Sequence, residues 1–82
     1  MVRVYFWRTS SGVEVDLVVD TGTVLVPIEV KSSATPRPAM GDSIRTFRAD
    51  LGRRAAEGYV LHAGDMRLPL GPGVQALPFA EL

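Results

Sequence analysis

Alternation of apolar and polar residues predicts three consecutive β-strands in the first part of the chain. Residues 2–8 are rich in β-branched and aromatic side chains, which favour strands. Residues 13–20 and 24–31 alternate with a period of two residues, as strands with two different faces do. Turn-forming residues fill 9–12 and 20–23. The pattern therefore predicts three strands joined by short turns.

The period changes to that of a helix in the middle of the chain. One apolar stripe runs along residues 39–51, formed by Met40, Ile44, Phe47 and Leu51, and Gly52 follows as a C-cap. Residues 58–63 are predicted to form a fourth strand, and residues 66–70 and 74–77 a small hairpin. The order βββαβ plus hairpin indicates an α/β (α+β) fold with a mixed sheet. The strand–helix–strand step implies a right-handed crossover.

Charged residues gather on one face of the second and third predicted strands. If Thr21 and Gly22 are the central turn residues, that face carries Glu14, Asp16, Glu29 and Lys31. Asp16 and Glu29 are then diagonal neighbours, roughly 7 Å apart at Cβ, and Glu14 lies opposite Glu29 as a like-charge pair. The other face is wholly apolar and is predicted to be the core: Val15, Leu17, Val19, Val24, Val26, Ile28 and Val30.

Two carboxylates at this separation can share one hard divalent cation. Mg²⁺, or Mn²⁺ in its place, takes one or two carboxylates and keeps several waters, so Asp16, Glu29 and Glu14 are the candidate ligands. Lys31 would project beside the metal, where it can orient a water or offset charge on a phosphate. Such a metal polarises a phosphoryl oxygen and lowers the pKa of an attacking water. A solvated charged face, which any hairpin with one wet side shows, remains the alternative.

Further polar residues could extend this site towards a nucleic acid. Arg37, Arg45, Arg48 and Ser32 are predicted to line a phosphate path beside the carboxylates. Surface ion pairs of Arg45 and Arg54 with Asp42 and Asp50, and serines that cap backbone groups, are the alternatives. His62, the only histidine, is interpreted as a strand-end residue because a zinc site would need further ligands.

Composition narrows the class of protein. The 82 residues suffice for one small domain, residues 1–82, and contain no cysteine, which excludes disulfides and thiolate metal sites. The formal net charge is zero, so a broadly basic nucleic-acid-binding surface is absent. No apolar run can cross a bilayer and no signal peptide is visible, so we expect a cytoplasmic protein with no membrane partner.

Five blocks of sequence carry a resemblance to a known family: YFWR at 5–8, SGVEVDLVV at 11–19, IEVKSS at 28–33, GYVLHAGD at 58–65 and LPLG at 68–71. In this order they resemble the C-terminal domain of unknown function of bacterial and archaeal AAA-type ATPases. That domain in turn resembles the PD-(D/E)XK nuclease-like superfamily. The resemblance implies a restriction-endonuclease-like fold with Asp16 and Glu29 as acidic ligands and Lys31 as the motif lysine.

The sequence departs from the superfamily pattern at two points. Val15 stands where the motif name has proline, and the chain starts in the first strand, without the helix that precedes it in the superfamily. Family members also carry an upstream P-loop ATPase domain, and no G-x-x-x-x-G-K-[ST] motif occurs here. The chain is therefore interpreted as a fragment of a larger ATPase, with a stand-alone remnant of such a protein as the alternative.

Two functional hypotheses follow. The first is a nuclease-like domain with divalent-metal-dependent phosphodiester hydrolysis on nucleic acid, and the alternative is a non-catalytic binding or assembly module of an ATPase. The missing helix should leave the Glu14–Lys31 face uncovered, including Val18, Leu25 and Pro27. We therefore expect a homodimer across that face or through the edge of the first strand, with Trp7 or Tyr5 near the contact.

Overall fold

The three predicted N-terminal strands form an antiparallel meander in the computed structural model, which describes residues 2–81. β1 (Arg3–Arg8) pairs with β2 (Glu14–Asp20), and β2 pairs with β3 (Leu25–Lys31). The pairing of β1 with β2 shifts register between Tyr5 and Trp7, which marks a β-bulge or irregularity. This shift in register determines which side chains of β2 face the helix.

The turn between β2 and β3 differs by one residue from the predicted turn. The N–H of Thr21 donates to the carbonyl of Val24 at 3.0 Å, so Gly22 and Thr23 are the central residues. Gly22 has a φ of 95°, a conformation that glycine adopts readily and other residues do not. Glycine at the first central position is the requirement of a type II′ hairpin turn.

The new turn shifts the cross-strand pairs by two residues. Val18 pairs with Pro27, whereas the predicted register pairs Val18 with Leu25. A shift of one residue would move every side chain to the other face, but a shift of two keeps the predicted faces. The predicted face assignment of β3 is therefore kept, while its partners on β2 change.

The second half of the chain adds three strands and one α-helix within the described residues. The helix α1 (Asp42–Leu51) follows a short 3-10 helix (Pro38–Gly41) and continues into another (Gly52–Arg54). β4 (Gly58–His62) pairs in parallel with β3, β6 (Val74–Pro78) pairs in parallel with β4, and β5 (Leu68–Pro69) closes the edge antiparallel to β6. A last 3-10 helix is Phe79–Glu81.

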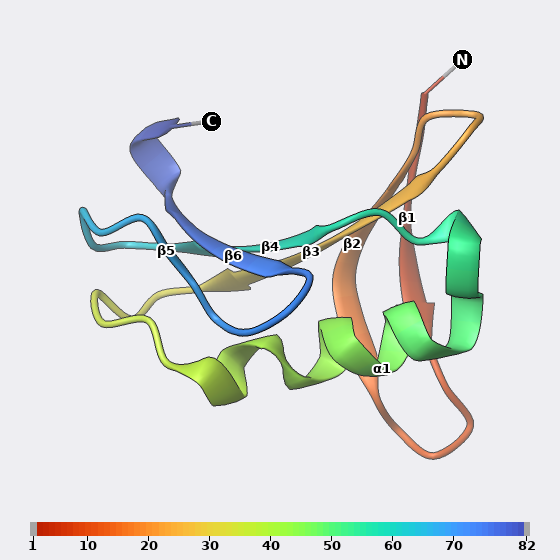
Figure 1. Ribbon diagram of the computed structural model, residues 1–82, viewed down its shortest axis with the longest axis horizontal. Helices are drawn as coiled ribbons and strands as arrows, with labels where there is room; N and C mark the ends of the chain where they lie inside the picture. Colours follow the sequence, from red (N-terminus) through yellow and green to blue (C-terminus); the bar gives the residue numbers. More distant parts are fainter. Residues whose placement is uncertain (1, 82) are drawn as a thin grey trace.

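The six strands make one mixed sheet in the order β1-β2-β3-β4-β6-β5, with α1 on one face (Figure 1). The predicted α+β architecture with a mixed sheet and a small C-terminal hairpin is confirmed. The hairpin does not stand apart, because its longer strand β6 joins the sheet beside β4.

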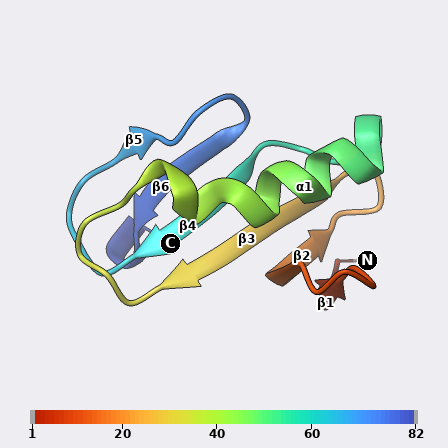
Figure 2. The same cartoon turned by 90° about the horizontal axis from the view of Figure 1, so that it is seen from below.

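The core lies between α1 and the sheet face that the helix covers (Figure 2). Phe47 packs with Val15, Val18 and Leu25, and its ring makes an edge-to-face contact with Trp7 at a centroid distance of 5.0 Å. A second cluster surrounds Ile44 nearer the C-terminal hairpin, formed with Val60, Leu70, Val74 and Ala76. The predicted apolar stripe of the helix is therefore the stripe that is buried.

The predicted core face of the hairpin is wrong. Of its seven residues only Val15 is buried, while Leu17 and Val30 are 37 % and 43 % exposed. Val18, Leu25 and Pro27, which we expected to be uncovered, lie buried on the same side of the sheet as α1. Val15 and Val18 are three positions apart and both buried, which a regular strand does not allow and the irregularity in β2 does.

The side of the sheet that α1 covers follows from the crossover and from one glycine. A β–α–β crossover places its helix on one fixed side, whatever the side chains of that side are. At Gly58 an added Cβ would lie 2.4 Å from Cγ2 of Ile44 and 2.9 Å from Cγ of Pro27. The missing side chain therefore lets α1 approach β3 and β4 closely on this face.

Candidate functional site

Asp16 and Glu29 hold each other through backbone amides of the facing strands. The N–H of Asp16 donates to Oε1 of Glu29 at 3.0 Å, and the N–H of Val30 donates to Oδ2 of Asp16 at 2.9 Å. The regular β2–β3 pairs run from Asp20 only as far as Leu17, so beyond that point carboxylates replace the backbone acceptors. The carboxylate of each predicted acidic residue therefore accepts a hydrogen bond from a backbone amide of the facing strand.

Lys31 completes the cluster. Its Nζ lies 3.7 Å from Oε2 of Glu29, and its side chain is 40 % exposed. Glu29 is 5 % exposed, because it points to the side of the sheet that α1 covers. The result is one buried carboxylate, one exposed carboxylate and one half-exposed ammonium group within a single corner of the sheet, here named the Asp16–Glu29–Lys31 cluster.

Burial raises the pKa of the Glu29 carboxyl above its ordinary value of 4.5. The N–H of Asp16 opposes this rise by bonding to the charged form, while the negative charge of Asp16 adds to it. The positive charge of Lys31 and the hydroxyl of Ser43, at the start of α1, also lower the pKa. Sequence reasoning missed Ser43, since nothing in the sequence shows which helix residue faces a strand carboxylate.

The raised pKa predicts how the Glu29→Gln variant changes stability with pH. A carboxyl that binds its proton more tightly in the folded state contributes stability at low pH and loses it as pH rises through the folded-state pKa. Glutamine keeps an acceptor for the N–H of Asp16 and has no charge to bury. We therefore expect the free energy of unfolding of Glu29→Gln, relative to wild type, to increase from about pH 4 to about pH 7.

Urea denaturation across this pH range measures the effect. Glu57→Gln is the matched control, because Glu57 is exposed and precedes β4 at the end of the strand remote from Lys31. A constant difference between Glu29→Gln and wild type, or the same slope for Glu57→Gln, would contradict the assignment of the buried charge to Glu29.

Glu14 is not brought to the cluster. Its carboxylate lies 3.6 Å from Nε of Arg8, and both side chains are about half exposed or more. No group of three His, Cys, Asp or Glu side chains within residues 2–81 is placed to hold a metal ion. The structure therefore joins the two predicted ligands Asp16 and Glu29 and leaves the third one apart.

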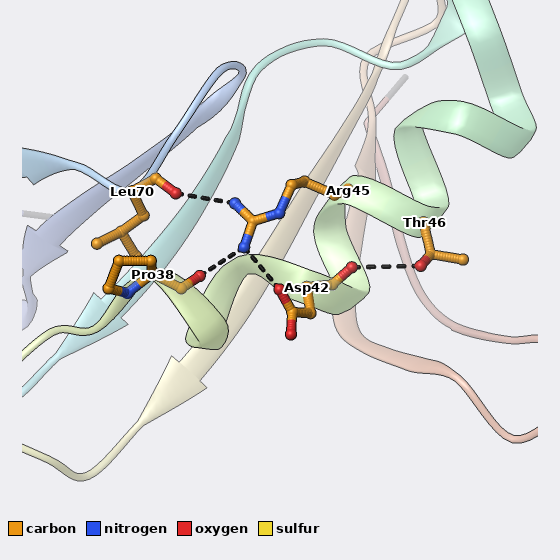
Figure 3. Close-up of polar contacts among 5 residues, drawn as sticks. All are labelled: Pro38, Asp42, Arg45, Thr46 and Leu70. Atoms are coloured by element: carbon orange, nitrogen blue, oxygen red, sulfur yellow. Dashed lines mark hydrogen bonds and ion pairs between the residues drawn. The ribbon is translucent and has the colours of Figure 1, made fainter.

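Arg45 is turned towards the protein, as Figure 3 shows. Its guanidinium donates to the carbonyl of Leu70 at 2.8 Å, to the carbonyl of Pro38, and to Oδ1 of Asp42 at 2.7 Å. These bonds tie α1 to the segment before it and to the C-terminal hairpin. The alternative interpretation of Arg45 as the partner of Asp42 is confirmed.

The other candidates for a phosphate path lie apart from one another. Nε of Arg48 donates to the carbonyl of Ala56 at 3.0 Å, so this arginine also holds the fold. Arg37 and Ser32 are exposed in the segment between β3 and α1. Of the four predicted residues, only these two present their side chains chiefly to solvent.

His62 is a buried strand-end residue beside the cluster. It pairs with Lys31 in the parallel β3–β4 ladder and is fully buried. Its Nδ1 accepts from the N–H of Gly64 at 3.1 Å, so Nε2 carries the proton and donates to the carbonyl of Met66 at 2.7 Å. The imidazole therefore fixes the conformation of the loop after β4. In the sequence, the only indication of this role is the glycine two residues after His62.

Comparisons with known proteins give a family but no described activity. A family model described as "Domain of unknown function (DUF4143)" matches residues 1–82. Two relatives, named as uncharacterized proteins of Mycobacterium bovis and Mycobacterium tuberculosis, are each 32 % identical over 78 residues, which is 95 % of this chain and 17 % of theirs. No solved structure matches. The chain thus spans about a sixth of the curated relatives it matches.

The helices within residues 2–81 are all too short or too polar to traverse a lipid bilayer.

Proposed function

The chain belongs to the DUF4143 family of domains of unknown function, and we propose that it is a nuclease-like domain that hydrolyses phosphodiester bonds of nucleic acid with the help of a divalent metal. The observation that carries the proposal is the contact between Asp16 and Glu29, with Lys31 beside them. The resemblance to PD-(D/E)XK nucleases and a cytoplasmic location belong to the same proposal.

The two carboxylates fit a hard cation such as Mg²⁺ or Mn²⁺. Backbone amides occupy Oδ2 of Asp16 and Oε1 of Glu29, which leaves one further oxygen on each residue. Mg²⁺ is commonly bound by one or two carboxylates, with waters completing its shell. A cation would also offset the charge of Glu29, whose ionised form burial disfavours.

Each residue of the cluster has a distinct part in the proposed chemistry. When bound, the metal supplies Lewis acidity for a phosphoryl oxygen and for a water. Glu29 and Asp16 would hold it, and their orientation is fixed by the amides that bind them. The ammonium group of Lys31 offsets charge on the phosphate or orients the attacking water, and exposed Arg37 and Ser32 are available to contact the polymer backbone.

The same cluster also supports a second candidate, a non-catalytic binding or assembly module. Oε2 of Glu29 already faces Lys31, and Oε1 accepts the N–H of Asp16, so the buried carboxylate has partners without a cation. The relatives are about six times longer than the match, and an upstream ATPase domain in such a longer polypeptide would use the module to hold a partner.

Metal titration tests the proposal. We expect Mg²⁺ and Mn²⁺ to bind wild type in calorimetry, and Mn²⁺ to broaden the amide resonances of Asp16 and Val30 in NMR spectra. Glu29→Gln should weaken binding at least tenfold, since it removes one of two anionic ligands, whereas Glu57→Gln should leave it unchanged. Absence of binding, or equal binding by both variants, would reject the metal site and favour the assembly module.

A further inference from the structure

The ammonium group of Lys31 lies at the oxygen of Glu29 that a metal ion would use. Oε1 of Glu29 accepts the N–H of Asp16 at 3.0 Å, so Oε2 is the oxygen without a backbone partner. Nζ of Lys31 is 3.7 Å from this Oε2. Glu29 is 5 % exposed, which leaves little access to Oε2 from solvent. A cation that binds Oε2 therefore competes with Lys31 for the same oxygen.

The other carboxylate of the cluster is open to solvent. Asp16 is exposed, and its Oδ2 accepts the N–H of Val30 at 2.9 Å, which leaves Oδ1. Within residues 2–81 no ion pair joins Asp16 to a basic side chain. The two carboxylates thus differ in their surroundings. The buried Glu29 has Lys31 as its counter-charge, and the exposed Asp16 has no cationic side chain at ion-pair distance.

We propose that Lys31 competes with the divalent cation for Glu29: its ammonium group pairs with Oε2 before the cation binds and leaves this oxygen when the cation arrives. The inference rests on the proposed metal site and adds an order of events to it. Lys31 is suited to such an exchange, because its side chain is 40 % exposed and its flexible stem lets the ammonium group move into solvent.

Electrostatic repulsion keeps the two cations from sharing Glu29. A divalent cation and an ammonium group about 5 Å apart repel each other enough to change a binding constant roughly tenfold, even at the dielectric constant of water. Salt reduces this repulsion only in part, because the Debye length is about 10 Å at an ionic strength of about 0.1 M. Burial disfavours the ionised form of Glu29 and raises its pKa, so a cationic neighbour stabilises this carboxylate both before and after the exchange.

The exchange gives Lys31 two partners in succession. Once displaced from Glu29, its ammonium group stays beside the cluster and can donate hydrogen bonds to a phosphate oxygen or to the attacking water. Removing the charge of Lys31 should therefore tighten metal binding and at the same time slow cleavage. Loss of a merely structural ion pair would instead weaken both, because the site itself would be disturbed.

Calorimetric titration of wild type and three variants with Mg²⁺ tests the inference. Lys31→Gln removes the charge and keeps a polar side chain, so its dissociation constant should be lower than that of wild type by about fivefold or more. Lys31→Arg keeps the charge and should bind Mg²⁺ within about twofold of wild type. Arg53→Gln controls for a positive charge removed elsewhere, because Arg53 is exposed after α1, and it should bind as wild type does.

NMR follows Lys31 in the wild-type protein itself. It is the only lysine of the chain, so the resonance of the methylene group next to its ammonium group is assigned without ambiguity. This resonance should shift as Mg²⁺ is added, with the dissociation constant that calorimetry gives. Circular dichroism shows whether each variant is folded. If Lys31→Gln does not fold, a lysine resonance that stays unmoved while Mg²⁺ binds wild type would overturn the inference.

The outcomes separate this inference from the proposed function. Mg²⁺ binding by wild type together with equal or weaker binding by folded Lys31→Gln would overturn the inference and leave the metal site intact. Absence of binding by both proteins would reject the metal site and the inference with it. Binding by Lys31→Gln alone would support the competition and show that Lys31 keeps the wild-type site closed to the cation.

Discussion

Replacing Phe47 by alanine is expected to lower the free energy of unfolding by about 3–5 kcal/mol, the usual cost of removing a buried phenyl ring. Phe47 is fully buried between α1 and the sheet, where it contacts Val15, Val18 and Leu25 and meets the edge of Trp7. Small domains have a total stability of about 5–15 kcal/mol, and a chain of 82 residues lies near the lower end. The variant should therefore be largely unfolded near 37 °C.

Phe6→Ala is the matched control, since it removes the same ring from the side of β1 that faces away from α1. Its effect should be about 0.5 kcal/mol or less, because Phe6 is more than half exposed. Urea denaturation followed by Trp7 fluorescence measures both variants. Equal losses for the two substitutions, or a larger loss for Phe6→Ala, would show that the helix does not pack on the face described.

Lys31→Ala is expected to lower metal-dependent cleavage of nucleic acid by about 100-fold or more, the effect typical of removing a positioned charge or proton-transfer group. Lys31 is the only lysine of the chain, and its ammonium group is the cation nearest Glu29 among the described contacts. Stability should fall in part, because Lys31 is 40 % exposed while its partner Glu29 is buried and loses a positive neighbour, so urea denaturation must show that the variant is folded under the conditions of the cleavage assay. If Lys31→Ala loses cleavage but remains folded, the result shows that Lys31 acts in the reaction and not only in stabilising the fold.

The local pattern of apolar and polar residues predicted the strands and the helix, and it predicted which residues form the Asp16–Glu29–Lys31 cluster. The alternation of residues 13–20 and 24–31 and the helical stripe through Ile44 and Phe47 gave strands and helix close to their observed bounds. The faces of β3 were also correct, because a period of two survives a register shift of two residues. Glu29 and Lys31 lie on one face for the same reason, and Asp16 meets Glu29 at the point where the regular β2–β3 pairing ends.

The sequence pattern could not predict contacts between residues that lie far apart along the chain. Nothing in the hairpin shows on which face the helix packs, and the wholly apolar face was taken for the core although the crossover and Gly58 place α1 on the other. Glu14 was expected beside Glu29 because the turn was placed one residue too early. Arg45 bonds to carbonyl groups of Pro38 and Leu70, which lie far apart along the chain and which no helical spacing can indicate.

Cleavage of labelled single- and double-stranded DNA and RNA by wild type, Lys31→Ala and Arg53→Ala, each with Mg²⁺, with Mn²⁺ and with chelator, tests the central claim most directly. Arg53 is exposed after α1, so its replacement removes one positive charge away from the cluster. The account predicts metal-dependent cleavage by wild type and Arg53→Ala and at least a 100-fold lower rate for Lys31→Ala. No cleavage by any of the three, or equal rates for wild type and Lys31→Ala, would contradict it.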